Sequence, residues 1–397
     1  MPWKETQKMD QRIEFVLKAI STENFRGLCR EYGVSPKTGY KWKQRFLQRG
    51  MEGMSELSRR PSGSPAALLE DTVCEIVRLK HAHPHWGPEK LRAVYARKHP
   101  SERAPSVSSF HRVLDRAGMV VRRKRRKAQQ AGRIHSGRKA KAPNEVWTVD
   151  FKGWWRDPEG ERCEPLTVRD EHSRYILCLE TPPSGRTGDV RKSFQRLFER
   201  HGLPEAIRSD NGSPFACVKA PLGLSRLSAW WVVLGIDLER GRPGCPQDNG
   251  GHERMHRDIQ RELAKAGCTT QESFDVWRDE FNHERPHQSL GNRTPSEFYQ
   301  PSRNTYQGTP EDIDYSGQES RKVSSTGKLS IENDKIFIST ALAGWSLGLT
   351  PGVGETTDIY FARLRLGYYD PVTASFHRAG TGPMEGANSH PKNQAKP

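Results

Sequence analysis

The spacing of apolar residues along the chain changes twice, and each change indicates a different kind of structure. Spacings of three and four residues over the first 120 positions predict amphipathic helices. Residues 143–300 mix short β-branched runs with helical spacing, which is typical of an α/β core with a mixed sheet. From residue 321 the alternation has a period of two. The pattern therefore predicts a multidomain protein with N-terminal all-α units, a central α/β core and a small C-terminal β-barrel.

Residues 1–55 are predicted to form a helix-turn-helix DNA-binding domain. Four apolar residues share one face of its first helix: Ile13, Val16, Leu17 and Ile20. A later helix begins at Ser35-Pro36, a Ser cap followed by Pro at the first helical position. That helix carries the short polar and basic side chains that a recognition helix presents to base edges and phosphates. These are Lys37, Thr38, Lys41, Lys43 and Arg45. A plain three-helix packing module is the alternative.

Residues 65–120 are predicted to form a second helix-turn-helix or winged-helix-like domain. Its recognition helix would begin at Ser106 and end at Gly118. The side chains expected to contact DNA are Ser108, Ser109 and Arg112. Three histidines at alternate positions within residues 81–85 raise a zinc hypothesis, but this spacing before Pro and Trp favours a loop.

The core, residues 143–300, has the predicted order strand, strand, strand, helix, strand, helix. The expected elements are strands at 146–154, 164–168 and 175–180, a helix at 190–201, a strand at 206–209 and a helix at 228–234. The first two strands would form a hairpin. The strand at 206–209 is expected to pair beside the first, which would make Asp150 and Asp210 neighbours. Asp170 is interpreted as a turn residue.

The C-terminal quarter of the chain has a different character. Residues 301–320 are polar and contain Pro and Gly, which indicates a linker. Residues 321–371 alternate in period two and predict a small antiparallel barrel of about five strands. Residues 372–397 lack periodicity and are expected to be disordered.

The charge of the chain favours a polyanionic partner. Its 397 residues carry a formal net charge of +16, and such an excess attracts DNA above all. Residues 121–142 form a basic linker whose first part is Arg122, Arg123, Lys124, Arg125, Arg126 and Lys127. We expect this linker to follow a phosphate backbone, with a merely solvated charge run as the alternative.

Other bulk properties narrow the class of protein. No apolar run approaches the ~20 residues that would span a bilayer, and the first residues are not typical of a signal peptide. The seven cysteines include no Cys-x-x-Cys pair, so neither a disulfide framework nor a zinc ribbon is predicted. A cytoplasmic protein with no membrane partner is expected.

Three carboxylates stand where they could bind a metal. Asp150 ends an apolar β-branched run, and Asp210 lies where a strand gives way to an Asn-Gly turn. Glu253 falls in the first turn of a helix expected to open after Asp248-Asn249-Gly250. Any one of them alone would be an ordinary cap or turn residue. Together they could converge on Mg²⁺, which prefers a few oxygen ligands.

The segments that hold these acids resemble a known family. They are Val146–Phe151, Arg208–Gly212 and Gln247–Arg254, with Phe281–Leu290 and its Asn-x-x-Arg-Pro-His run as a fourth. The combination resembles bacterial insertion-sequence transposases of the retroviral-integrase superfamily. The resemblance implies a ribonuclease-H-like core and two Mg²⁺ ions, with Mn²⁺ as a substitute. In that arrangement Asp150 would bridge the two ions, and Asp210 and Glu253 would each complete one site.

The chain departs from the family pattern in two places. More residues separate Asp210 from Glu253 than is common, and a loop insertion around residues 215–227 is the expected reason. Many relatives carry Lys seven residues after the catalytic Glu, where this chain has Gln260. Four residues of the Glu253 helix are expected to offer a DNA face instead: Arg254, His256, Arg257 and Arg261. A solvated basic face is the alternative.

The resemblance implies a transposase that binds its element's terminal repeats and uses Mg²⁺ to cleave DNA and transfer a strand into target DNA. Its partners would be double-stranded DNA and further copies of the chain on that DNA. It would be located in the bacterial cytoplasm, at the nucleoid. Two alternatives stay open: a catalytically silent DNA-binding repressor of transposition, and a ribonuclease-H-like nuclease.

Overall fold

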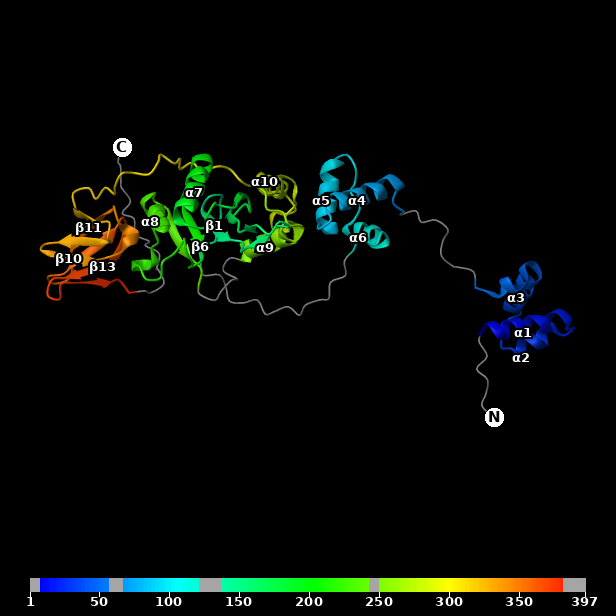
Figure 1. Cartoon of the computed structure of the whole chain (residues 1–397). Coiled ribbons are helices and arrows are strands. Elements are labelled where there is room, and N and C mark those ends of the chain that lie inside the picture. Colours follow the sequence, from blue (N-terminus) through cyan, green and yellow to red (C-terminus); the bar gives the residue numbers. More distant parts are fainter. Residues whose placement is uncertain (1–7, 57–66, 121–136, 243–249, 381–397) are drawn as a thin grey trace, which may run out of the picture. The chain divides into compact units, whose positions relative to one another are not determined.

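The computed structural model describes residues 8–56, 67–120, 137–242 and 250–380. The chain divides into two compact units, residues 1–70 and 71–397 (Figure 1). Among the helices within these ranges, none is both long and apolar enough to cross a membrane. The basic run at residues 122–127 and the expected cap at residues 248–249 lie outside the described residues.

The first unit is a three-helix module of α1 (Lys8–Ser21), α2 (Phe25–Glu31) and α3 (Pro36–Arg49). As predicted, Ser35 caps α3 and accepts a hydrogen bond from the Thr38 amide. The buried face of α1 differs from the prediction. Leu17 and Ile20 are exposed, and Phe15 and Ala19 pack inward instead. The cause is the turn of about 100° per residue, which makes two adjacent apolar stripes on α1 equally compatible with the spacing.

The second unit begins with α4 (Glu70–Ala82), α5 (Pro88–Lys98) and α6 (Val107–Arg116). Helix α6 begins at Val107, where the sequence predicts a recognition helix, and Ser106 caps it by accepting from the Ser109 amide. Contacts between these helices and the core include two hydrogen bonds and the Arg285 guanidinium over the Trp86 ring. The Arg97 guanidinium donates to the Glu284 carbonyl at 2.5 Å, and the Asn292 amide donates to the Glu89 carboxylate at 3.1 Å.

The core is a five-stranded mixed sheet in the order β5-β4-β1-β6-β7. Its strands are β1 (Val146–Phe151), β4 (Leu166–Asp170), β5 (Ile176–Glu180), β6 (Ala206–Ser209) and β7 (Asp237–Arg240). Strand β1 pairs antiparallel with β4 and parallel with β6. The expected neighbourhood of the strand at 206–209 and the first strand is therefore confirmed.

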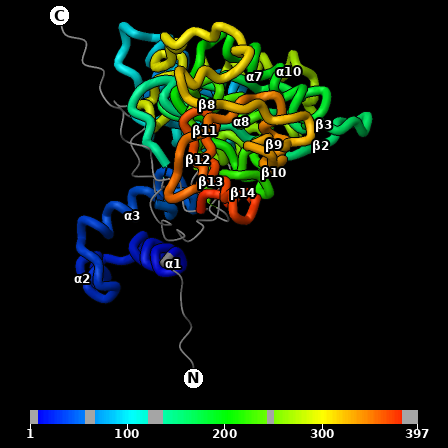
Figure 2. Tube along the Cα trace, turned by 90° about the vertical axis from the view of Figure 1, so that its left-hand side faces the viewer, coloured from blue at the N-terminus to red at the C-terminus, as the bar shows by residue number. Residues whose placement is uncertain are grey.

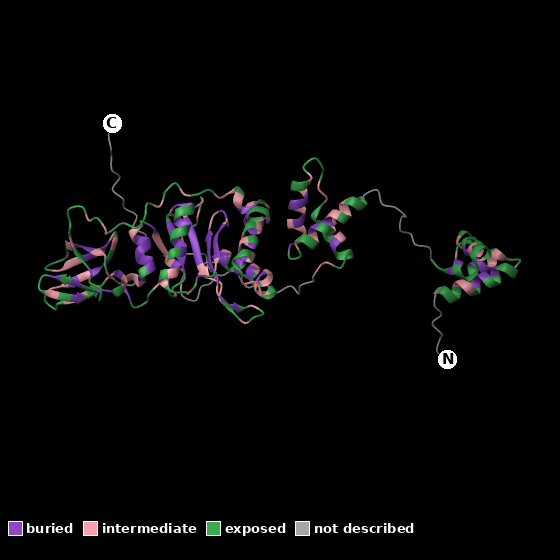
Figure 3. Ribbon diagram, turned by 45° about the horizontal axis from the view of Figure 1, so that its top comes forward, coloured by how far each residue is buried: buried purple, intermediate pink, exposed green. Residues whose placement is uncertain are grey.

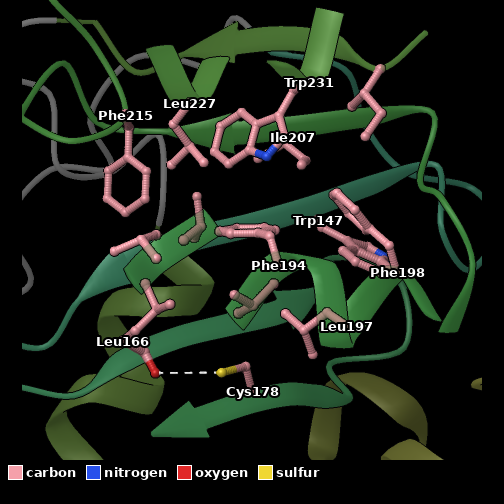
Figure 4. Close-up of a cluster of buried hydrophobic side chains, with 14 of the residues drawn as sticks. Trp147, Leu166, Cys178, Phe194, Leu197, Phe198, Ile207, Phe215, Leu227 and Trp231 are labelled. Carbon is pink, nitrogen blue, oxygen red and sulfur yellow. Dashed lines mark hydrogen bonds between the residues drawn. The ribbon is translucent and has the colours of Figure 1, made fainter. Parts of the chain in front are cut away.

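Helices cover both faces of this sheet (Figure 3). They are α7 (Thr187–His201), α8 (Arg226–Val233), α9 (Gly250–Glu262) and α10 (Gln271–Asp279). Side chains alternate across a strand, so Trp147 and Val149 of β1 pack with Phe194 of α7 and Trp231 of α8 (Figure 4). The other face of β1 carries Thr148 and Asp150 toward α9.

Two features of the core differ from the prediction. The first strand ends at Phe151, because Gly153 has a φ of +83° and the chain turns before a separate short hairpin. That hairpin is β2 (Trp155–Arg156) with β3 (Arg162–Cys163). Strand β7 was not predicted, since its Asp-Leu-Glu-Arg sequence has no apolar alternation. It is an edge strand, tied to β6 by an ion pair between Glu239 and Arg208 at 2.7 Å.

The C-terminal region is an antiparallel sheet in the order β14-β13-β12-β11-β8, accompanied by a β9–β10 hairpin, and these strands do not join into one closed barrel. The strands are β8 (Glu319–Lys322), β9 (Lys328–Ile331), β10 (Asp334–Phe337), β11 (Ser346–Pro351), β12 (Thr357–Phe361), β13 (Leu364–Asp370) and β14 (Ser375–Arg378). Two predictions are corrected. The barrel is an open sheet, and the tail expected to be disordered from residue 372 begins with β14, which pairs with β13. Residues 381–397 lie outside the described range.

Helix α8 joins the C-terminal sheet to the core (Figure 2). Its Leu227 and Trp230 pack into the core cluster, while Ala229 and Val232 pack against strands of the C-terminal sheet. Leu224, in the segment expected to be a loop insertion, joins the same C-terminal cluster. The extra residues between Asp210 and Glu253 therefore form part of the surface against which the C-terminal sheet packs.

Candidate active site

Asp150 and Asp210 reach equivalent positions at the ends of two adjacent parallel strands. The register pairs Thr148 with Arg208, and each aspartate lies two residues beyond its member of that pair. Asp210 follows the last residue of β6, and its carboxylate accepts a hydrogen bond from the Gly212 amide at 3.1 Å. Neighbouring strands lie about 4.8 Å apart, so the two aspartates are direct neighbours, as predicted from the sequence.

Glu253 lies in the first turn of α9, as predicted, and its side chain is exposed. The start of α9 fits closely against the sheet at Gly251. A Cβ at Gly251 would lie 2.5 Å from Nη2 of Arg169 and 2.8 Å from Nη1 of Arg174. Arg169 is itself buried and paired with Glu171. A side chain at position 251 would therefore displace the ends of these two arginine side chains, of which Arg169 is held by Glu171.

The carboxylates act on one another electrostatically. Burial raises the pKa of Asp150, and the nearby charges of Asp210 and Glu253 raise it further, to about 7. Among the residues with a described placement, no three His, Cys, Asp or Glu side chains are grouped closely enough to hold a metal ion. The three carboxylates therefore affect one another electrostatically, but their side chains are not close enough together to bind a single ion. Their oxygen donors and crowded negative charge fit a hard divalent cation.

Two buried histidines fasten α9 to the sheet directly behind Asp150. The Thr167 hydroxyl donates to the Asp150 carbonyl at 2.8 Å and lies 2.6 Å from Nε2 of His252 and 2.8 Å from Nε2 of His256. A hydroxyl has one proton to give, so both imidazoles donate to it through Nε2–H. Nδ1 of His252 lies 2.9 Å from the Thr148 hydroxyl, which also lies 3.3 Å from the Arg169 carbonyl.

Both imidazoles are neutral in this environment. Burial lowers the pKa of His256 to about 3 and lowers that of His252 well below its usual range. Nδ1 of His256 lies 3.9 Å from the Asp150 carboxylate. The placement of His256 on an exposed DNA face is therefore corrected. His252, Met255, His256 and Ile259 recur at spacings of three and four, and that spacing is the signal by which this inward face could have been recognised.

Lys152 is a further residue of the site that the sequence did not single out. Its Nζ donates to Oε1 of Gln260 at 3.1 Å. Burial lowers the pKa of Lys152, while attraction to Glu253 and Asp150 opposes the shift. The ammonium therefore lies within the field of the carboxylates. Arg261 is engaged elsewhere, with Asp258 at 2.7 Å and Glu262 at 2.5 Å.

The Asn-x-x-Arg-Pro-His run contacts β5 and the helix α9 that carries Glu253. The Asn282 amide bonds both backbone groups of Ile176 in β5, at 2.8 and 2.9 Å. Arg285 is buried and binds the carboxylates of Asp258 and Glu262 in the last turns of α9. Burial alone would raise the pKa of Glu262, but Arg285, Arg261 and Trp277 together lower it. This motif therefore fixes the far end of the Glu253 helix.

Exposure divides the residues predicted to contact DNA into two groups. The exposed ones within the described residues are Lys37, Lys41, Ser108, Arg112, Arg254 and Arg257. Those partly or fully buried are Thr38, Lys43, Arg45, Ser109, His256 and Arg261. Lys43 donates a hydrogen bond to the Ala19 carbonyl at 2.7 Å and so satisfies a carbonyl in the last turn of α1. Ser108 and Arg112 line a hollow of about 720 Å³ at the start of α6.

Comparisons with known proteins agree with this architecture. Two models described as "Integrase core domain" match residues 140–246 and 234–295. A "Helix-turn-helix domain" matches residues 11–62, and a "Homeodomain-like domain" matches residues 38–114. The chain therefore carries an integrase core preceded by helix-turn-helix DNA-binding domains.

Its relatives include proteins of bacterial insertion elements. The chain is 27% identical over 255 residues to the uncharacterized 31.7 kDa protein of insertion element IS407 from Burkholderia multivorans, which covers 62% of this chain and 87% of that protein. It is 24% identical over 253 residues to the 39.2 kDa protein of IS476 from Xanthomonas euvesicatoria, covering 62% of this chain and 70% of that protein. Among solved structures, the catalytic core domain of BIV integrase covers 39% of this chain and is itself covered to 93%, with 24% identity and a TM-score of 0.31. The predicted resemblance to proteins of bacterial insertion sequences is therefore confirmed.

Proposed function

We propose that this protein is the transposase of a mobile element, which binds the element's terminal repeats, cleaves DNA at its ends and joins a 3′ end to target DNA. The observation that carries the proposal is the shared register of Asp150 and Asp210, with Glu253 close enough to raise the pKa of Asp150. Three carboxylates in one field have no structural purpose of their own, because like charges repel.

Asp150, Asp210 and Glu253 would hold the two Mg²⁺ ions that the resemblance implies. The ions would supply charge stabilisation for the attacking and leaving oxygens of an in-line phosphoryl displacement. The protein supplies position. His252, His256 and Gly251 hold the start of α9 against the sheet, and so fix the distance between Glu253 and Asp150.

Lys152 would bind the phosphate that lies between the carboxylates and α9. Its ammonium is already directed to this space by Gln260. It would take the place of the lysine that many relatives carry at the position of Gln260. The exposed Arg254 and Arg257 would contact flanking phosphates, since each basic contact to duplex DNA adds affinity that falls with salt.

The two helix-turn-helix units would read the terminal repeats, with α3 and α6 as recognition helices in the major groove. The basic linker at residues 121–142 would follow the backbone between the second unit and the core. Further copies of the chain would assemble on the paired ends. Cytoplasmic action at the nucleoid follows from the DNA substrate.

The experiment compares cleavage of a terminal-repeat duplex in Mg²⁺ by the wild-type chain and by three variants, Asp150→Asn, Asp210→Asn and Glu253→Gln. Each variant should lose cleavage and keep end binding, because the helix-turn-helix units are untouched. Glu272→Gln is the matched control, since Glu272 also lies exposed in the first turn of a helix, α10. A variant of the three that cleaves at the wild-type rate would remove that residue from the site. End binding with no cleavage by the wild-type chain would favour the repressor.

A further inference from the structure

Strand β7 ends in an arginine that reaches the strand leading to Asp210. Strands β6 and β7 are parallel, and their register pairs Ser209 with Arg240, the last residue of each strand. Nη1 of Arg240 donates to the Ser209 hydroxyl oxygen at 2.9 Å and, more weakly, to the Asp210 carbonyl at 3.4 Å. The Arg240 guanidinium therefore lies where the chain leaves β6 and enters the candidate site.

The Ser209 hydroxyl connects Arg240 to the backbone of Asp210. A hydroxyl has one proton to give. Because the Ser209 oxygen accepts from Arg240, its own proton can be donated to the Asp210 carbonyl, which lies 3.1 Å away. Hydrogen bonds in such a chain polarise and strengthen one another. Arg240 and Ser209 therefore act together on the peptide of Asp210.

Two further hydrogen bonds join the turn at Asp210 to the end of β7. The Gly241 amide donates to the Ser209 carbonyl at 3.2 Å, and the Asn211 side chain donates to the Gly241 carbonyl at 2.8 Å. These bonds hold the residues before and after Asp210. The contact from Arg240 and Ser209 adds the carbonyl of Asp210 itself, so the whole turn is tied to β7.

The Arg240 side chain extends from the face of the sheet that is turned away from α9. Arg208 is paired in register with Thr148, whose hydroxyl contacts His252 of α9. Side chains alternate across a strand, so Ser209 lies on the opposite face, which α7 and α8 cover (Figure 4). Its register partner Arg240 shares that face. Arg240 therefore lies across the sheet from the helix that is proposed to contact DNA.

The Arg240 guanidinium is enclosed, and ion pairing does not account for its position. Its Nη2 is buried without a hydrogen bond to any described residue. Within the same set of residues it makes no ion pair with a carboxylate, whereas Glu239 of the same strand pairs with Arg208. Burial lowers the pKa of Arg240 to about 10, and the charge of Asp210 opposes that shift. A buried cation without a carboxylate partner is costly, so its contact with the Asp210 segment better explains its position.

We propose that Arg240 is a positioning residue for Asp210. Through the Ser209 hydroxyl it fixes the backbone of Asp210, and so holds the carboxylate in place for a divalent cation. The inference rests on the proposed function. Loss of a residue that orients a metal ligand commonly weakens metal binding. Loss of a positive charge near the site acts in the opposite sense, because that charge repels the cation. The two possible roles of Arg240 therefore predict opposite changes in Mg²⁺ affinity.

The test measures the Mg²⁺ affinity of the full-length chain without DNA, from the rise in melting temperature as Mg²⁺ is added at pH 8. Arg240→Met should need roughly ten- to a hundredfold more Mg²⁺ than the wild type for half of the full rise. Arg240→Lys, which keeps the charge and a donor, should recover most of this loss. Affinity for terminal-repeat duplex without metal should stay the same in both variants, because Arg240 does not face the DNA.

Two further variants test the route of the effect. Ser209→Ala, a small change, should weaken Mg²⁺ binding in the same direction. Combined with Arg240→Met it should cost less than the product of the two single effects, because both remove the same contact. Arg363→Met is the matched control. Arg363 also contacts β7, at Asp237 at 2.6 Å, so its loss removes an equal charge and should leave Mg²⁺ affinity unchanged.

An Arg240→Met protein that binds Mg²⁺ as tightly as the wild type, or more tightly, would overturn the inference. So would a loss of affinity for duplex ends with a smaller salt dependence, which would place Arg240 on a DNA phosphate. In either case, Mg²⁺-dependent cleavage by the wild-type chain would leave the proposed function intact.

Discussion

The ammonium of Lys152 donates a 3.1 Å hydrogen bond to the side-chain oxygen of Gln260, so a cation from the end of β1 is held against the outer face of α9. The two residues are 108 positions apart in the chain. Their contact explains how this protein keeps a positive charge beside its carboxylates although Gln260 is itself neutral. Arg261 is paired instead with two acids of its own helix, so Lys152 is the basic residue that we propose for the site.

Removal of the Lys152 charge should slow DNA cleavage. Lys152→Gln should reduce the single-turnover rate about ten- to a hundredfold, the loss expected for one hydrogen bond to a charged group. The exchanged double variant, Lys152→Gln with Gln260→Lys, should recover most of that loss, because it returns an ammonium to the same contact. A double variant as slow as the product of its two single effects would show that the contact does not act as a pair.

Metal-free protein should lose stability as the pH rises. The folded pKa of Asp150 is about 7, above the ordinary value of 3.8. Between these values the folded state holds a proton that the unfolded state has released, so the free energy of unfolding falls as the pH rises through this window. The loss is a few kcal/mol at most, since a tenfold difference in proton affinity between the two states corresponds to about 1.4 kcal/mol.

The pH effect is measured by thermal unfolding in chelator between pH 5 and pH 8. Asp150→Asn should unfold at a higher temperature than the wild type at pH 8 and should lose the difference at low pH. Mg²⁺ should raise the melting temperature of the wild type at pH 8 and leave that of the variant nearly unchanged. A wild-type and variant pair with parallel pH profiles would contradict the assignment of the raised pKa.

Gly251→Ala should separate DNA binding from catalysis. The added methyl group would meet the guanidiniums of Arg169 and Arg174, which are held by Glu171. Either these guanidiniums or the start of α9, with Glu253, must then shift. We expect cleavage to fall at least tenfold while end binding stays the same. Gly250→Ala is the control, because a Cβ there meets no atom within 4 Å. Equal cleavage by both variants would argue against the close fit.

Arg285→Met should destabilise the core strongly. The side chain of Arg285 is 1% exposed and pairs with Asp258 at 3.3 Å and with Glu262. Loss of one partner of a buried ion pair costs about 3–5 kcal/mol, because the remaining charges stay buried. Denaturant unfolding measures the loss. Arg278→Met is the control, since Arg278 pairs with the more exposed Asp275 and Asp279 and should cost much less. Similar losses in both variants would contradict the role of Arg285 in fixing α9.

The sequence predicted those parts of the site that local pattern determines. Strand ends and a helix start placed Asp150, Asp210 and Glu253 correctly in their elements, and the pairing of β1 with β6 followed from the order of elements. His256 was misplaced because a histidine near arginines suggests a basic surface. Only the tertiary contact with Thr167 shows that it points inward.

Other features depend on contacts that no local pattern reveals. Strand β7 has one apolar residue in four and exists because β6 offers a parallel edge to it. The C-terminal strands were recognised individually, but whether they close into a barrel depends on which strands pair. Strand β14 is polar and is held by the ladder it makes with β13. The contact of Lys152 with Gln260 likewise joins segments far apart in sequence.

The measurement that tests the account most directly is strand joining. A labelled terminal-repeat duplex with a free 3′-hydroxyl is incubated with target plasmid, Mg²⁺ and the full-length chain, and the products are separated by denaturing electrophoresis. The account predicts that labelled strand becomes covalently attached to plasmid. It also predicts that the product vanishes with a 3′-deoxy end or with Glu253→Gln, and persists with Glu272→Gln. Cleavage of the duplex without any joined strand, over a range of salt and Mg²⁺ concentration, would contradict the transposase and favour a nuclease.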